Sequence, residues 1–201
     1  MATETKTPAN VAHWSPYRLT VRQFEAMIKA GLFPEDAHVE LLGGMLVDQM
    51  TRHHPHNFAV LSLSEQLREI LPAPWLISEE KPVEIGRRWR PEPDLAVILG
   101  PTNRYRGRNV SKRDARLLIE VAYSSYAIDR GEKWRAYAAA RIPCYWIVHL
   151  AKGQVEVYRD PAGSGKSAAY KSTEVFGVDA SIPVEIDGQE VGRVALRDFM
   201  P

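Results

Sequence analysis

Two short stretches decide the fold of this chain: PEPDLAVI at residues 91–98 and RLLIEVA at residues 116–122. Each is an apolar run of strand length that contains a carboxylate inside or beside it, Asp94 in the first and Glu120 in the second. Burying an unpaired carboxylate is costly, so such a residue normally has a charged partner or binds a metal. Two of them at the ends of adjacent strands predict an oxygen site for one hard divalent cation, and therefore metal-dependent phosphodiester chemistry.

Composition places the chain among ordinary globular proteins. Its 201 residues are 45% hydrophobic and 25% charged, which suits one domain with a full core. The formal net charge is only +1, so any affinity for nucleic acid must come from a local basic patch. Cys144 is the single cysteine, which excludes an intramolecular disulfide, and its apolar neighbours predict a buried side chain.

Residues 1–10 are polar and contain no apolar signal core. Residues 1–16 are polar and predict a flexible lead, followed by one domain over residues 17–201. No run approaches the roughly 18 apolar residues that a membrane-spanning helix needs. We therefore expect a cytoplasmic protein without a membrane partner.

Periodicity and turn signals predict the order of the elements. Thr20 and Gln23 form a capping-box pattern for a helix that ends at Gly31, and Gly43-Gly44 marks a hairpin. The remaining elements are a helix at 55–71, strands at 75–85, 92–99 and 116–122, a helix at 128–141, a strand at 145–150, and further strands near 155–158, 184–186 and 191–196, the last two joined by a tight turn at 186–189.

This order predicts an α/β (α+β) fold with a mixed sheet flanked by helices. The strand at 145–150 follows a helical crossover, so it is expected to lie parallel to a neighbour. An early hairpin and a C-terminal hairpin add antiparallel pairs. In the crossover helix, Asp129 and Lys133 are four residues apart and so lie on one face, which Tyr137 continues.

At this point the chain resembles the PD-(D/E)XK nuclease superfamily and, more narrowly, the Uma-two family of restriction-endonuclease-like proteins. The resemblance covers residues 19–199. It is carried by VELLGG at 39–44, His56, PDLA at 93–96, LIEVAYS at 118–124, the helix with Asp129, Lys133 and Tyr137, and YWIV at 145–148. It implies a restriction-endonuclease-like sheet and hydrolysis of a phosphodiester bond by metal-activated water.

The resemblance also implies roles for single residues. Asp94 and Glu120 would ligate magnesium or manganese. The superfamily lysine normally lies two residues after the glutamate, where this chain has Ala122, so Lys133 on the next helix is the expected replacement. Taken alone, Asp94 and Glu120 also fit simple ion pairs, and Lys133 also fits an exposed helix position.

A second group of candidates surrounds these three. Glu40 interrupts an apolar strand. Its carboxylate is either a third ligand, a group that supports the ligands, or a structural charge at a strand end. His56, at a helix start, is placed either to contact phosphate or a ligand, or to pack at the core edge. Asp129 either holds Lys133 through an i,i+4 ion pair or caps the helix.

Two motifs resemble known binding sites but lack the spacing or the residues that those sites need. His53-His54-Pro55-His56 lacks the spacing of a helical zinc pair, so a polar loop is the better interpretation. Residues 163–167, GSGKS, end like a phosphate-binding loop, but Asp160 stands where that pattern needs glycine. We expect a hairpin tip there.

A basic loop is the candidate nucleic-acid contact. It contains Arg104, Arg106, Arg108, Lys112 and Arg113 and is placed either along a phosphate backbone or in solvent. The expected function is thus a magnesium-dependent endonuclease acting on nucleic acid, with DNA as the expected substrate, working as a homodimer. The alternatives are a catalytically weak binding or interaction module of the same fold and an enzyme acting on another phosphate ester.

Overall fold

A six-stranded mixed sheet forms the centre of the molecule in the computed structural model, which describes residues 15–34, 36–48 and 53–201. The predicted flexible lead at 1–16 lies almost wholly outside these residues. The strands, in spatial order, are β10 (Ala169–Gly177), β9 (Gln154–Ala162), β8 (Cys144–His149), β7 (Ala115–Ala122), β5 (Leu95–Leu99) and β3 (Trp75–Glu79). β7 and β8 are parallel, as the helical crossover between them predicts, and the other neighbours in this sheet are antiparallel.

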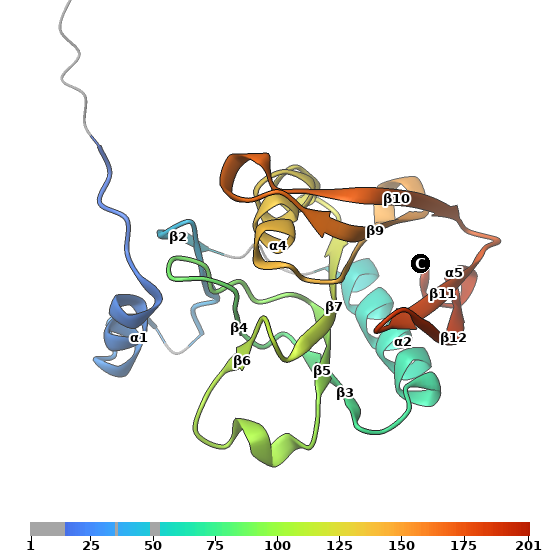
Figure 1. The fold of residues 1–201 in the computed structure, drawn as a ribbon, viewed down its shortest axis with the longest axis horizontal. Coiled ribbons are helices and arrows are strands. Elements are labelled where there is room, and N and C mark those ends of the chain that lie inside the picture. The colour runs from blue at the N-terminus through green and yellow to red at the C-terminus, as the bar shows by residue number, and fades with distance from the viewer. Residues whose placement is uncertain (1–14, 35, 49–52) are drawn as a thin grey trace, which may run out of the picture.

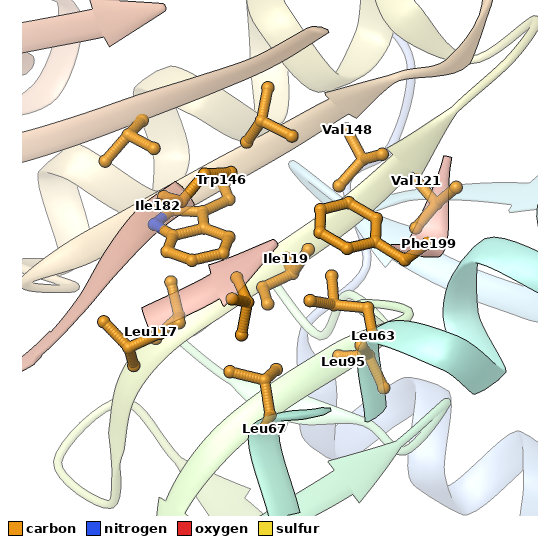
Figure 2. Close-up of a cluster of buried hydrophobic side chains, with 14 of the residues drawn as sticks. Leu63, Leu67, Leu95, Leu117, Ile119, Val121, Trp146, Val148, Ile182 and Phe199 are labelled. Carbon is orange, nitrogen blue, oxygen red and sulfur yellow. The ribbon is translucent and has the colours of Figure 1, made fainter. Parts of the chain in front are cut away.

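One face of the sheet packs against α2 (His54–Ile70), the β11–β12 hairpin and α5 (Leu196–Phe199). β11 spans Ser181–Ile186 and β12 spans Gln189–Ala195, joined by the predicted tight turn. Figure 2 shows this core, where apolar side chains of the sheet meet α2 and α5. Cys144 is buried in it, as expected. The C-terminal elements therefore cover this face of the sheet, and the candidate functional residues lie towards the other face.

The opposite face is covered by one continuous helical segment: α3 (Tyr126–Ile128), η2 (Asp129–Lys133) and α4 (Trp134–Ala140). A regular helix at 128–141 was predicted, but η2 is a π turn in which the Trp134 N–H donates to the Asp129 carbonyl, five residues back. The same carbonyl accepts from the Tyr145 hydroxyl at 3.1 Å. π turns of this kind are frequent at functional sites.

The N-terminal elements lie at one end of the sheet, far from α5 (Figure 1). α1 (Val21–Lys29) has the predicted capping box, and β1 (Val39–Leu42) pairs with β2 (Met45–Asp48) around the predicted Gly43-Gly44 turn. Gly44 has φ +81°, and a Cβ there would stand 2.8 Å from the Leu19 carbonyl oxygen. Only glycine therefore lets the lead before α1 dock on this hairpin.

The strand predictions differ from the structure at residues 75–85 and 169–177. The single strand expected at 75–85 divides into β3 and β4 (Val83–Glu84), separated by Glu80 with φ +50°. β4 joins β6 (Val110–Ser111) in a separate parallel pair. β10 was not predicted because its sequence is polar and largely exposed. The segment at 163–167 does connect the antiparallel strands β9 and β10, as a hairpin tip with a short 3₁₀ turn, η4 (Gly165–Ser167).

Two other 3₁₀ turns, η1 (Thr102–Tyr105) and η3 (Leu150–Lys152), complete the element list. Within the described residues, no helix is both long and apolar enough to cross a membrane.

Candidate active site

Asp94 and Glu120 are cross-strand neighbours. β5 pairs with β7 so that Leu95 stands opposite Ile119, and one further step along this register puts Asp94 opposite Glu120. Leu95 and Ile119 pack toward α2, so the two carboxylates project to the face covered by η2 and α4. The Val121 N–H donates to Asp94 Oδ2 at 2.7 Å. Strand alternation and register thus bring both predicted metal ligands together.

Lys133 reaches the same place from η2. Its Nζ lies 3.1 Å from Glu120 Oε1 and 3.0 Å from Glu40 Oε1, with Asp129 Oδ1 farther away at 3.9 Å. All four side chains are buried. Lys133 from the helical segment therefore contacts Glu120 directly.

Burial and charge compete in this cluster. Burial alone would lower the pKa of Lys133, but the carboxylates of Glu120, Glu40 and Asp129 outweigh it and raise that pKa. Burial raises the pKa of Glu120 well above its usual range, against the opposing effect of Lys133. Burial likewise raises the pKa of Asp129 to about 6. The one ammonium group of Lys133 therefore lies among more carboxyl groups than a single positive charge can neutralise.

The second group of predicted residues surrounds this centre. Glu40 Oε1 accepts from the Glu92 N–H at 2.6 Å as well as facing Lys133. His56, at the start of α2, places Nε2 3.1 Å from Asp94 Oδ1. Asp129 is not the N-cap residue of the segment, which is Ser125, and its side chain is buried.

A pocket of about 420 Å³ opens onto these residues, lined by Glu40, His56, Asp94, Glu120, Asp129 and Lys133 together with Tyr123, Ser125 and Ile128. Glu120 Oε1 accepts from Lys133 and from the Tyr137 hydroxyl, at 3.1 and 2.7 Å, whereas Oε2 forms no hydrogen bond within the described residues. Those residues contain no group of three or more histidine, cysteine, aspartate or glutamate side chains arranged to hold a metal. Asp94 and Glu120 are the residues that could hold a divalent cation through oxygen.

In the structure, some residues of the predicted basic loop form ion pairs and others are exposed. Arg108 donates to both oxygens of Asp114, at 2.6 and 2.9 Å, and Arg104 lies 3.8 Å from the same carboxylate. Arg108 beside it holds the pKa of Asp114 well below its usual range. Arg106 is exposed, and Lys112 and Arg113 face a groove beside α1. The loop is thus partly a structural ion pair.

The Uma2 family model, described as "Putative restriction endonuclease", matches residues 21–191. The chain belongs to the Uma2 family. The matched range begins at α1 and ends in β12, so it contains every candidate residue from Glu40 to Lys133.

One solved structure has a similar fold. That structure, described as a "putative nuclease belonging to DUF820 from Anabaena variabilis ATCC 29413", superposes with a TM-score of 0.63 at 15% identity. The match covers 87% of this chain and 96% of that one. A comparison with curated proteins found no match.

Sequence reasoning missed two contacts of this Uma2 site. Glu92 lines the pocket and holds Glu40 through its backbone N–H, and burial raises its pKa. Its place two residues before Asp94, on an extended segment, was the available signal. The sequence placed Tyr137 only on the face of Asp129 and Lys133, whereas in the structure its buried hydroxyl donates to Glu120. A tyrosine one turn beyond Lys133 on the same face was the signal there.

Proposed function

We propose that this Uma2 protein is a divalent-metal-dependent endonuclease that hydrolyses phosphodiester bonds of DNA. The observation that carries the proposal is the cross-strand pair Asp94 and Glu120, buried beside Lys133 at the base of a pocket. Buried carboxylates are costly, and two more, Glu40 and Asp129, line the same pocket together with the half-buried Glu92. Such a concentration favours a site that binds a cation and a phosphate.

The donor set fits magnesium or manganese held by Asp94 and Glu120. Glu120 Oε2 is available for a ligand, because the hydrogen bonds of this carboxylate fall on Oε1. A divalent cation bound there would supply positive charge to the scissile phosphate and lower the pKa of a nearby water. The remaining positions would belong to water and substrate oxygens.

The other residues orient this pair. Lys133 contributes a donor and a positive charge beside Glu120, where it can orient water or stabilise charge that develops on the phosphate. Glu40 fixes the ammonium group from the opposite side, at 3.0 Å. His56 holds the Oδ1 side of Asp94, while the Val121 N–H holds Oδ2. This leaves each candidate ligand with one defined orientation.

Two substitutions test the assignment in opposite ways. Asp94→Asn removes a proposed ligand, so we expect manganese binding by calorimetry and plasmid cleavage to be lost together. Lys133→Met removes a cation that competes for Glu120, so we expect manganese binding to persist while cleavage falls at least about 100-fold. Cleavage that survives Asp94→Asn would refute the site.

The alternative of a catalytically weak module rests on Ala122, which is buried at the usual lysine position. DNA binding by the wild type without cleavage in magnesium or manganese would favour that alternative. The expected homodimer stays a prediction, to be tested by sedimentation.

A further inference from the structure

A second hollow lies away from the carboxylates, between α1 and the β4–β6 pair. It is an open groove of about 1430 Å³, lined by six exposed cationic side chains: Arg18, Arg22, Arg87, Arg88, Lys112 and Arg113. The whole chain has a formal net charge of only +1, so this is a local concentration of positive charge.

None of these six side chains forms an ion pair with another described residue. Arginines elsewhere do pair, as Arg108 does with Asp114 and Arg159 with Glu174. The two carboxylates of the groove, Glu25 and Glu84, both accept from Asn109 Nδ2, at 2.8 and 2.7 Å. The groove therefore keeps a surplus of positive charge for a partner.

Backbone hydrogen bonds fix the three segments that carry these cations. The Val21 N–H donates to the Arg87 carbonyl at 2.8 Å, which ties the start of α1 to the turn after β4. The Lys112 N–H donates to the Glu84 carbonyl at 3.0 Å, which ties the segment after β6 to β4. The spacing of the charges is thus set by the fold, which lowers the entropic cost of binding an extended polyanion.

The β1–β2 hairpin connects the groove to the catalytic pocket. Its turn residue Gly44 donates to the Arg88 carbonyl and accepts from the Leu19 N–H, at 2.8 and 2.9 Å. Glu40, on the same hairpin, contacts Lys133 in the pocket. Gly44 and Glu40 are four residues apart, and four residues of extended chain span at most about 14 Å. The edge of the groove at Gly44 therefore lies within roughly four base pairs of DNA from Glu40 in the pocket.

Electrostatics requires such a surface if the substrate is a polyanion. The described residues that line the catalytic pocket bring one ammonium group, that of Lys133, and six carboxyl groups, those of Glu40, Asp48, Glu92, Asp94, Glu120 and Asp129. It therefore repels phosphates beyond the one that a bound cation attracts.

We propose that the groove holds the phosphodiester backbone of a DNA duplex while the neighbouring pocket receives the scissile phosphate. The identification of the partner as DNA rests on the proposed function, whereas the inference that the groove binds a polyanion rests on the groove alone. Each phosphate contact made by an arginine or lysine releases counterions, so binding should weaken steeply with salt.

The test is binding of a fluorescent 20-base-pair duplex to the full chain in EDTA, where cleavage cannot occur, over a series of salt concentrations. The variant Arg87→Ser/Arg88→Ser removes two groove cations. Lys171→Ser/Arg197→Ser is its control, because it removes two exposed cations, on β10 and α5, that do not line the groove. We expect the groove variant to lose at least about tenfold in affinity and about 1.8 from the slope of log K against log salt, and the control to retain both.

Conservative replacement by Arg87→Lys/Arg88→Lys keeps the charges and should keep the slope. Equal affinity and slope in the groove and control variants would overturn the proposal, as would a wild type that does not bind the duplex at low salt. Tighter binding of a polyglutamate peptide than of DNA at equal salt would replace nucleic acid by an acidic protein. A wild type that binds through the groove but never cleaves would leave this proposal standing and refute the nuclease function.

Discussion

The sheet face beneath α4 carries two buried glutamates that invite comparison. Glu120 on β7 and Glu156 on β9 are each 4% exposed and are separated across the sheet only by Ile147 of β8. The sequence around each is an apolar strand interrupted by one carboxylate. By strand pattern alone they are equivalent.

One stripe of the helical segment above them serves both glutamates. Tyr126 donates to Glu156 and Tyr137 to Glu120, in both cases at 2.7 Å. Arg130 and Lys133 then bring a cation to each, both at 3.1 Å. The helical segment thus gives each glutamate one tyrosine hydroxyl and one positive charge, and Glu156 also accepts from the Tyr158 hydroxyl of its own strand.

What differs is the wider surroundings. Burial raises the pKa of Glu156, but the hydroxyls of Tyr158 and Tyr126 and the guanidinium of Arg130 lower it more, so the net shift is downward. At Glu120 burial prevails, and Asp129, Asp94 and Glu40 raise the pKa further. Glu156 is a satisfied structural anion, whereas Glu120 is held at an electrostatic disadvantage. Such disadvantage is typical of functional sites.

The largest difference should appear in catalysis. Glu120→Gln removes a proposed metal ligand, so we expect manganese-dependent nicking of plasmid DNA to fall by at least about 1000-fold. Glu156→Gln is the matched control and should stay within about tenfold of the wild type. Similar losses in both variants would mean that the two glutamates act alike and that Glu120 holds no special place.

The stability of the metal-free protein should change in the opposite order. Glu156→Gln replaces a charge-assisted acceptor and should lower the free energy of unfolding by about 2 kcal/mol at pH 7. Glu120→Gln removes a repelled, buried charge and should leave that free energy unchanged or raise it by up to about 1 kcal/mol. Urea titration in EDTA measures both values. A loss in Glu120→Gln equal to that in Glu156→Gln would contradict the comparison.

The stabilisation by Glu156 should also depend on pH. Because its pKa is below the ordinary 4.5 in the folded protein, the ionised form favours folding. The difference in unfolding free energy between wild type and Glu156→Gln should therefore be full above about pH 5 and shrink as pH falls below 4.5. A difference that grows on acidification would show that the pKa is raised instead.

Much of this arrangement was predictable from the sequence. Alternation along two strands puts Asp94 and Glu120 on one face, and the i,i+4 spacing brings Asp129 and Lys133 to one side of a helix. Both are local rules that depend on few residues. The parallel pairing of β7 and β8 followed in the same way from the helix between them.

The rest depends on contacts distant in sequence. The π turn at 129–133 coincides with a hydrogen bond from Tyr145 to the Asp129 carbonyl, and no periodicity in the helix sequence encodes that. The role of Tyr137 depends on which residue accepts a hydrogen bond from its hydroxyl. The basic groove combines residues near 18–22, 87–88 and 111–113, which no local pattern joins. Propensity finds the elements, but only tertiary packing selects which charges stay unpaired.

The smallest expected effect concerns the two tyrosines. Tyr137→Phe and Tyr126→Phe remove hydrogen bonds of equal length to Glu120 and Glu156, so each should cost about 1 kcal/mol of stability. Only Tyr137→Phe should weaken manganese binding, by about tenfold, because its hydroxyl orients a proposed ligand. Calorimetric titration of both variants compares them directly. If Tyr126→Phe weakens manganese binding as much, the hydroxyls act through the placement of the shared helical segment, and the two glutamates are not independent.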